Sequence, residues 1–370
     1  MPSAAEAYVE SLSPWPRDGF GLERIKAVLS ELGEPQLEYP SIHVVGTNGK
    51  STVTRTIEEL LARQGLAVGA YLSPHVRGWS ERIRVRGAEA DFDRVIERVR
   101  GPAERIGATQ FELLTAAALA EFAAAEVDVA VVEAGLGGRY DATNVLRSPV
   151  QVLTNVALEH TDVLGTTREA IAREKLAVVQ RGAAVVVGEP EWEELARANG
   201  AATVVVAARS NLAIALAAAE GFVGRPVDGH VDVRLPGRLE HVRDDPLEIW
   251  DGAHNLAGVG YVLARLPSAR YVVVASILAD KDVEGMVAAL SALGDRFVAT
   301  TSSSSRALSA ADLAERAQRY FREVEARDDP TEALVHARGL GGPVLVTGSL
   351  YLLADLAKDE TRRWRTLAKG

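Results

Sequence analysis

A glycine-rich segment that carries one lysine and two hydroxyl residues lies between an expected strand and an expected helix. It reads Gly46-Thr47-Asn48-Gly49-Lys50-Ser51-Thr52 and follows the apolar run 41–45. The backbone N–H groups of such a loop can surround phosphate oxygens. The positive end of the helix and the lysine attract the phosphates, and a hydroxyl can reach Mg²⁺. The strict Walker A pattern fails because Val44 stands where glycine is required. The arrangement still predicts a phosphate-binding loop, and the alternative is a glycine turn with an incidental lysine.

An acidic residue and a histidine are expected close to this loop. Glu133 lies at the end of the apolar run 128–134, and His160 lies in the loop after the next expected strand. In open α/β sheets such strand ends converge beside a phosphate loop. With the hydroxyl of Ser51 or Thr52 they would form a magnesium site, although histidine is a softer ligand than magnesium usually takes. The alternative for His160 is a loop histidine that is hydrogen-bonded to the backbone. Glu133 needs a partner in any case, because it is a carboxylate at the end of an apolar strand.

Lysine is rare in this chain, since six of its 41 basic residues are lysines. Lys175 lies in an expected helix beside Arg173, and the ordinary interpretation is a solvated lysine in a charged helical turn. A lysine can offer a neutral amine when its pKa is lowered, which an arginine essentially cannot. Lys50 and Lys175 are therefore the candidate functional cations of this chain.

The composition is that of an ordinary globular protein of 370 residues, with 47% hydrophobic and 25% charged residues. The lack of cysteine excludes disulfides, thiolate metal sites and cysteine nucleophiles. A net charge of -10 argues against nucleic-acid binding, which needs a basic surface. No apolar run approaches the length of a membrane span, and residues 1–10 do not resemble a signal peptide. We therefore expect a cytoplasmic protein with no nucleic-acid or membrane partner.

Short β-rich runs alternate with helical stretches, which predicts an α/β fold with mainly parallel sheets. The pattern breaks around residues 233–238, and we expect an N-terminal domain over 1–235 and a smaller domain over 236–370. The expected strands span residues 41–45, 128–134, 150–154, 183–187 and 203–206, then 247–250, 271–274, 296–299 and 344–346. Alanine-rich helices are expected at 113–125 and 212–220.

The phosphate loop resembles the ATP loop of the Mur ligase superfamily, which reads GTNGK followed by small hydroxyl residues. Further segments narrow the resemblance to folylpolyglutamate synthase/dihydrofolate synthase, and they follow that family's order along nearly the whole chain. These segments are residues 20–26, 73–75, 81–83, 111–115, 133–144, 154–165, 235–238, 251–255, 280–282 and 347–351.

The resemblance implies a P-loop-type Mur ligase ATP-binding domain with a mainly parallel sheet, followed by a Rossmann-like domain that binds glutamate. It implies an amide ligase that phosphorylates a carboxylate of dihydropteroate or a folate with ATP and joins glutamate to the acyl phosphate. ATP, two magnesium ions and CO₂ are the implied cofactors, with CO₂ carried as a carbamate on Lys175. The expected partners are small-molecule substrates, and we expect a monomer.

The resemblance also implies roles for single residues in the first domain. Ser73 would join Glu133 and His160 at magnesium. Asn211 would hold the adenine, although by itself it is typical of a helix N-cap. The substrate candidates are His75, Trp79, Phe111 and Thr115, of which the last three form the pterin side or, alternatively, pack in the core.

In the second domain the implied residues follow the break near residue 235. Arg238 and Asp251 would approach ATP. His254 and Asn255 would lie at the glutamate and nucleotide side, with His254 and Asp251 among the catalytic residues. Ser349 would receive the amino acid or merely cap a helix, and Lys281 would contact glutamate or lie in a solvated turn.

One departure from the family concerns substrate selection, because the segment between Gly188 and Asn211 is shorter than is typical there. Two other functions stand as alternatives. One is another Mur-type amino-acid ligase that acts on a non-folate carboxylate, against which the folate-type segment 20–26 argues. The other is a nucleotide-dependent switch that hydrolyses ATP without ligation.

Overall fold

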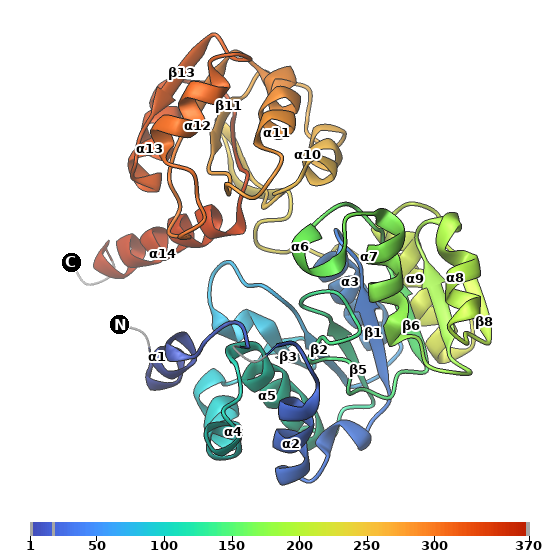
Figure 1. Ribbon diagram of the computed structural model, residues 1–370. Helices are drawn as coiled ribbons and strands as arrows, with labels where there is room; N and C mark the ends of the chain where they lie inside the picture. The colour runs from blue at the N-terminus through green and yellow to red at the C-terminus, as the bar shows by residue number, and fades with distance from the viewer. Residues whose placement is uncertain (1–2, 17–18, 368–370) are drawn as a thin grey trace. The chain divides into compact units, whose positions relative to one another are not determined.

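The computed structural model describes residues 3–16 and 19–367, with the side chains of the last helix described up to Lys358. The chain forms two compact units (Figure 1). The first runs up to Pro74 and then from Trp79 to Val233, and the second combines His75–Gly78 with the residues from Arg234 onward. Both units are mixed α/β structures built on mainly parallel sheets, so the predicted fold class is confirmed.

The first unit is built on one sheet that is parallel except at one edge. Its strands are Ser41–Val45 (β1), Val68–Tyr71 (β2), Ile83–Val85 (β3), Ala88–Glu89 (β4), Val129–Glu133 (β5), Val150–Leu153 (β6), Ala184–Val187 (β7) and Thr203–Val206 (β8). They are arranged in the order β4-β3-β2-β5-β1-β6-β7-β8, and β3 and β4 pair antiparallel. Because the strands from β2 to β8 in this order are parallel, their carboxyl ends lie at one edge, where ligand sites of α/β sheets form.

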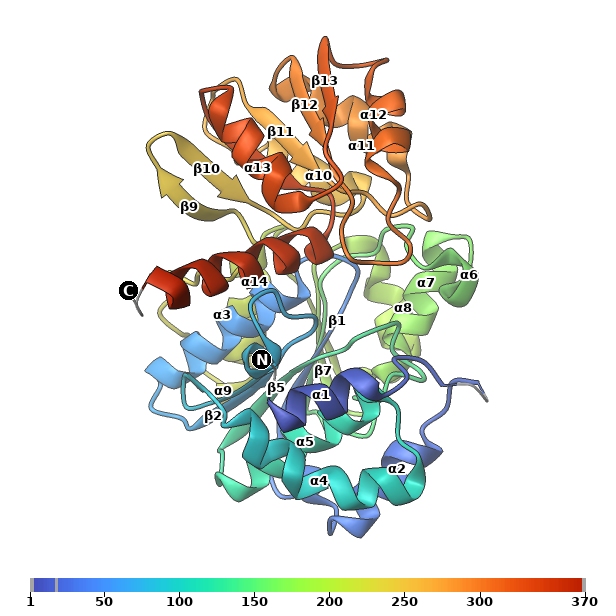
Figure 2. The ribbon, with the colours of Figure 1, turned by 90° about the vertical axis from the view of Figure 1, so that its left-hand side faces the viewer.

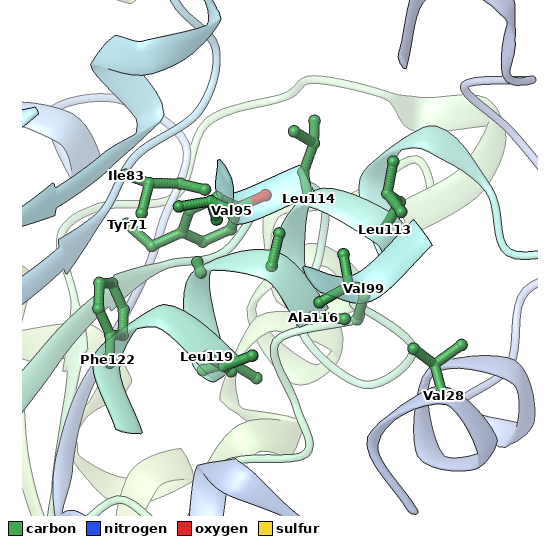
Figure 3. Packing of buried hydrophobic residues seen from close by; sticks show 14 of the residues in the cluster. Val28, Tyr71, Ile83, Val95, Val99, Leu113, Leu114, Ala116, Leu119 and Phe122 are labelled. Carbon is green, nitrogen blue, oxygen red and sulfur yellow. The ribbon is translucent and has the colours of Figure 1, made fainter. Parts of the chain in front are cut away.

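Helices cover both faces of this sheet. They are Ala4–Ser11 (α1), Glu23–Glu31 (α2), Lys50–Arg63 (α3), Phe92–Ile106 (α4), Gln110–Ala124 (α5), Thr161–Leu164 (α6), Arg168–Lys175 (α7), Glu193–Ala198 (α8) and Asn211–Val223 (α9). Short 3₁₀ turns lie at Pro35–Leu37, Trp79–Arg82, Leu176–Val178 and Pro190–Trp192. Along β5 the side chains alternate, so that Val129 and Val131 pack with α3 and α9 while Ala130 and Val132 face the other layer. That other layer contains α4 and α5 (Figures 2 and 3), and Figure 3 shows Tyr71 and Phe122 in its core.

Two differences from the sequence prediction have local physical causes. The helix expected from residue 113 begins at Gln110 because Thr109 caps it, and Glu112 completes the capping box. Strands β2, β3 and β4 were not predicted, because each has only two to four residues, too few for an alternating pattern to stand out.

The second unit carries its own sheet and core. Its strands are Glu240–Asp244 (β9), Leu247–Trp250 (β10), Val272–Ala275 (β11), Arg296–Ala299 (β12), Glu323–Ala326 (β13) and Val344–Thr347 (β14). Their order is β13-β12-β11-β14-β10-β9, and β9 pairs antiparallel with β10. The two edge strands β9 and β13 were not predicted, because charged residues interrupt their apolar pattern.

Helices flank the second sheet on both faces, as in Rossmann-like domains (Figure 2). They are Leu256–Leu263 (α10), Val283–Leu290 (α11), Ala310–Ala317 (α12), Pro330–Gly339 (α13) and Leu350–Leu367 (α14), with a 3₁₀ turn at Ser291–Leu293. One core joins the sheet to α10, α11 and α12, and the other joins it to α13 and α14. In the residues that the structure describes, we find no helix with the length and apolar character needed to span a bilayer.

Candidate active site

The predicted phosphate loop connects β1 to α3, as expected. Gly49 precedes the helix with φ of 82°, a left-handed conformation that glycine adopts without strain. The first N–H groups of α3, beginning with Lys50, have no acceptor within the helix, and they carry the positive end of the helix dipole. The Lys50 ammonium donates to the Thr47 carbonyl at 3.1 Å, so its charge lies over the loop. These features form an anion-binding cradle.

Glu133 lies directly beside this cradle because β5 pairs with β1, which sets Glu133 opposite Val44. The side chain is 1% exposed, and the predicted need for a partner is met twice. The hydroxyl of Ser51 donates to Glu133 Oε1 at 3.0 Å, and the backbone N–H of Ser73 donates to Oε2 at 3.1 Å. The structure thus brings three of the predicted metal-site residues together at the carboxyl ends of β1, β2 and β5.

The donor types at this place suit magnesium. Glu133 and Ser51 offer a carboxylate and a hydroxyl, the oxygen ligands that Mg²⁺ prefers. Across the described part of the chain, no group of three or more His, Asp or Glu side chains could hold a metal ion by itself. A magnesium ion that keeps water and phosphate ligands needs no such group, because one or two carboxylates suffice.

Lys175 is buried rather than solvated, so the ordinary interpretation of this lysine is wrong. Its residue is 5% exposed, and its ammonium donates to the Gly46 carbonyl at 2.8 Å. Burial, with a smaller effect from the positive charge of Lys50, lowers the pKa of the amine from 10.5 to about 7. A substantial share of the Lys175 side chains is therefore neutral near pH 7.

His160 lies in the loop that follows β6. Its backbone is left-handed with φ of 50°, and it immediately precedes the short helix α6. The same loop contacts the phosphate loop farther upstream, where the Ala157 N–H donates to the Thr47 hydroxyl at 3.0 Å. His160 therefore belongs to a loop that touches the cradle, and its role at the metal stays a prediction.

A residue that the sequence analysis left without a role holds the phosphate loop in place. Asn155 accepts from the Asn48 N–H at 3.0 Å and donates to the Asn48 carbonyl at 2.9 Å. The Thr154 hydroxyl donates to the same carbonyl at 2.8 Å. The sequence offered one signal for this role, because two polar residues directly follow the apolar run that forms β6. The structure adds that β6 lies beside β1 in the sheet. The sequence could not show that these side chains point to the loop.

Asn211 lies against the phosphate loop, but it is not the helix N-cap. Ser210 caps α9 by accepting from the Ala213 N–H, and Asn211 is the first helical residue. A Cβ on Gly49 would come within 2.6 Å of Asn211 Oδ1, so the two residues are in close contact. The position of Asn211 beside the loop is compatible with an adenine contact, which stays a prediction.

The four substrate candidates of the folate side differ in their surroundings. Thr115 is fully buried and its hydroxyl donates to the Phe111 carbonyl, which favours the core-packing alternative for this residue. Phe111 is partly exposed and lies against Gly135, at the carboxyl end of β5. Trp79 stacks on Phe92 and is partly exposed. The partly exposed His75 belongs to the second compact unit.

In the second unit Asp251 organises the turn after β10. Its carboxylate accepts the N–H groups of Leu239 and Ala253, each at 2.8 Å. Burial raises the pKa of Asp251, and the nearby positive charge of Arg238 opposes that shift. His254 directs Nδ1 to the Gly252 carbonyl at 2.9 Å.

The remaining candidates of the second unit lie at helix starts and strand ends. Asn255 is the N-cap of α10 and accepts from the Gly258 N–H at 2.8 Å. Ser349 is 1% exposed and its hydroxyl accepts from the Tyr351 N–H, so the helix-cap alternative describes its contact in this structure. The Lys281 side chain is 9% exposed and lies 3.8 Å from Asp280, so the solvated-turn alternative is wrong.

Comparison with known proteins tests the resemblance directly. A family model described as Mur ligase middle domain matches residues 44–220, and one described as Mur ligase, glutamate ligase domain matches residues 237–350. The dihydrofolate synthase/folylpolyglutamate synthase of Escherichia coli K12 is 34% identical over 402 aligned positions, covering 95% of this chain and 93% of that protein. The chain belongs to the folylpolyglutamate synthase/dihydrofolate synthase family of Mur ligases.

Solved structures of this family share the fold. One is E. coli FolC in complex with DHPP and ADP, with a TM-score of 0.86 and 31% identity, covering 98% of this chain and 100% of that one. Another is the bifunctional folylpolyglutamate synthase/dihydrofolate synthase of Yersinia pestis with AMPPNP and a Mn ion. It has a TM-score of 0.85 and 32% identity, covering 96% of this chain and 97% of that one.

Proposed function

We propose that the protein is an ATP-dependent ligase that joins L-glutamate to a carboxylate of dihydropteroate or a folate. ATP transfers its γ-phosphoryl group to the carboxylate, the glutamate amine attacks the acyl phosphate, and an amide, ADP and phosphate result. The observation that carries the proposal is the grouping of the phosphate loop, the buried Glu133 and the buried amine of Lys175 in a chain of this family.

The phosphate loop would bind the nucleotide with its backbone and with Lys50. The first N–H groups of α3 and the Lys50 ammonium would stabilise the negative charge of the phosphates during transfer. We assign the loop residues Gly46, Thr47, Asn48, Gly49, Lys50, Ser51 and Thr52 to this task. Asn211 would contact the adenine, and Arg238, Asp251 and Asn255 would contribute from the second unit.

Magnesium would be held by the oxygen donors beside the cradle. We assign Glu133, Ser51, Thr52 and Ser73 to it, with His160 as a further ligand. The ion would draw charge from the phosphate oxygens. Two supports for this assignment are the Ser51 to Glu133 hydrogen bond and the Mn ion in the Yersinia pestis structure.

Lys175 would carry a carbamate formed with CO₂. That reaction needs a neutral amine, and a pKa of about 7 supplies one at physiological pH. The neutral amine bonds to the carbon of CO₂ and releases one proton, so the side chain becomes an anion with two oxygen donors. An anion at this position would add a ligand for magnesium next to the Gly46 carbonyl that Lys175 now contacts.

The two organic substrates would be bound by different domains. The region 1–235 would hold ATP and the pterin-bearing acid, with Phe111 and Trp79 beside the pterin ring. His75, four residues before Trp79 in the sequence, would also contact this acid. The region 236–370 would hold glutamate through His254, Lys281 and Ser349, and the match of residues 237–350 to a glutamate ligase domain supports this. We further propose that the enzyme works as a cytoplasmic monomer, which sedimentation and fractionation would test.

The deciding experiment supplies dihydropteroate and tetrahydrofolate separately, each with glutamate, ATP and magnesium. Mass spectrometry of the products shows which acid gains a glutamate residue and whether several are added. Phosphate release that requires both an acid and glutamate is the expected result. Release that is indifferent to both would overturn the ligase in favour of an ATPase switch, and ligation of a non-folate acid alone would indicate a different Mur-type substrate.

A further inference from the structure

The loop after β6 holds the phosphate loop through several hydrogen bonds. The Thr47 N–H donates to the Asn155 carbonyl at 2.9 Å, and the Thr47 hydroxyl accepts from the Ala157 N–H. The Asn48 N–H and carbonyl are both bonded by the Asn155 amide, and the Thr154 hydroxyl shares that carbonyl. The peptide that leads into Gly49 is thus held from one side.

We propose that Asn155 is a positioning residue that holds the phosphate loop open for the nucleotide through its two-point contact with Asn48. The proposal rests on the proposed function, in which this loop binds the phosphates of ATP. Asn155 needs no contact with the nucleotide itself, because it acts through the Asn48 peptide.

The physical reason lies in the orientation of one peptide. A carbonyl that points into a phosphate site repels the phosphate oxygens, whereas an N–H group binds them. With Asn155 and Thr154 both donating to it, the Asn48 carbonyl is held toward the loop after β6. The glycines on either side, Gly46 and Gly49, leave the backbone free to rotate when that hold is absent.

An asparagine is suited to this position because its amide carries a donor and an acceptor without charge. An aspartate could still accept from the Asn48 N–H, but it would lose the donor and place a negative charge beside bound phosphates. Preorganisation of this kind lowers the free energy that the ligand must spend on ordering the loop.

The chain contains a matched control at the opposite edge of the same sheet. Gln180 makes the same kind of two-point amide contact, accepting from the Ser148 N–H at 3.2 Å and donating to the Leu146 carbonyl at 2.5 Å. Both side chains are partly exposed. Ser148 precedes β6, so this contact lies at the amino ends of the strands, away from the phosphate loop.

The test compares Asn155→Ala with Gln180→Ala in the full chain. Titration calorimetry with ADP and magnesium measures the Kd, and hydrogen exchange of the ligand-free chain measures the mobility of residues 46–52. We expect Asn155→Ala to raise the ADP Kd about tenfold, the equivalent of one or two hydrogen bonds. Exchange in residues 46–52 should become faster, and Gln180→Ala should change neither quantity.

Thr154→Val gives a second, milder measurement, since it removes one donor to the Asn48 carbonyl and keeps the shape of the side chain. Its Kd for ADP should lie between the Kd of the unaltered chain and that of Asn155→Ala. An unchanged Kd in Asn155→Ala, or an equal loss in Gln180→Ala, would overturn the inference. If the unaltered chain fails to bind ADP, the proposed function is wrong, and the exchange comparison still decides whether Asn155 holds the loop.

Discussion

At the scale of single residues, the protonation of the Lys175 amine depends strongly on its surroundings in the fold. Its sequence context is a charged helical turn, yet the folded chain buries the amine against the Gly46 carbonyl. Burial disfavours the charged form, and the Lys50 ammonium adds to the effect. The same residue type at the exposed position 358 has no such environment.

Replacing Lys175 by arginine tests whether the amine or only its charge matters. Lys175→Arg should reduce ligation about a hundredfold or more, because a guanidinium cannot form the carbamate and an important contact near the metal is lost. Product formation at saturating substrates measures the effect, and circular dichroism checks the fold. Lys175→Met also removes the amine, but without introducing a bulky cation. The matched control is Lys358→Arg, the same exchange at an exposed position. Full activity in either Lys175 variant would refute the carbamate.

The pKa of Lys175 also predicts a pH dependence. Because the pKa falls from 10.5 to about 7 on folding, the unfolded chain binds one more proton than the native chain between those values. Stability therefore rises with pH across that window, and the penalty for a buried ammonium is complete below it. At equal dissolved CO₂, a ¹³C carbamate signal should be strong at pH 8 and weak at pH 6. The signal should vanish in Lys175→Met, and its persistence there would assign it to another amine.

At the scale of elements, a buried ion pair joins β10 to α13. Glu248 is 1% exposed, and Arg338 donates to its two oxygens at 2.7 and 2.8 Å. The Trp250 indole N–H donates to the same carboxylate at 2.8 Å. An anion in this position is stable only while its donors remain, so the pair connects the strand to the helix that covers it.

Removal of the arginine should therefore destabilise the second unit. Arg338→Ala should lower the free energy of opening of β10 and β14 by about 3 kcal/mol, because it leaves a buried carboxylate without its cation. Hydrogen exchange of those strands measures the loss. The exposed pair of Arg270 and Asp295 supplies the control, since Arg270→Ala should cost less than about 1 kcal/mol. Equal losses in the two variants would show that burial of Glu248 is unimportant.

At the scale of the whole molecule, each unit has its own sheet and its own buried cores. The phosphate loop and its bracing residues belong entirely to the first unit. A ligand that binds there stabilises that unit by a free energy that rises with the logarithm of the ligand concentration once this concentration exceeds the Kd.

Magnesium and ADP should therefore raise the stability of the first unit directly. At a hundredfold excess over the Kd the gain is about 2.7 kcal/mol. The midpoint of thermal unfolding should rise with the logarithm of the ADP concentration. Hydrogen exchange of the backbone amides in β1 and α3 shows whether the first unit is the part that ADP stabilises. A midpoint that does not respond to ADP would contradict nucleotide binding at the loop.

Much of the fold was predictable because it follows local patterns. The run 41–45, the glycine loop and the helix after it are all neighbours in sequence, and the structure confirms their order. The strands β9 and β13 were missed because an edge strand does not need an apolar pattern. The N-cap alternative for Asn211 is wrong, because Ser210 beside it is an equally good cap and sequence alone does not choose between them.

The sequence by itself determined the chemical inventory: a phosphate loop, an acidic strand end, a rare lysine and the order of family motifs. Only the tertiary structure decided how these groups act on one another. The parallel pairing of β1 with β5 brings Glu133 to Ser51, and its pairing with β6 brings Asn155 to Asn48. The lowered pKa of Lys175 likewise comes from burial by segments distant in sequence. The physical reason is that hydrogen bonds and desolvation depend on distances in space, which residue types along the chain do not specify.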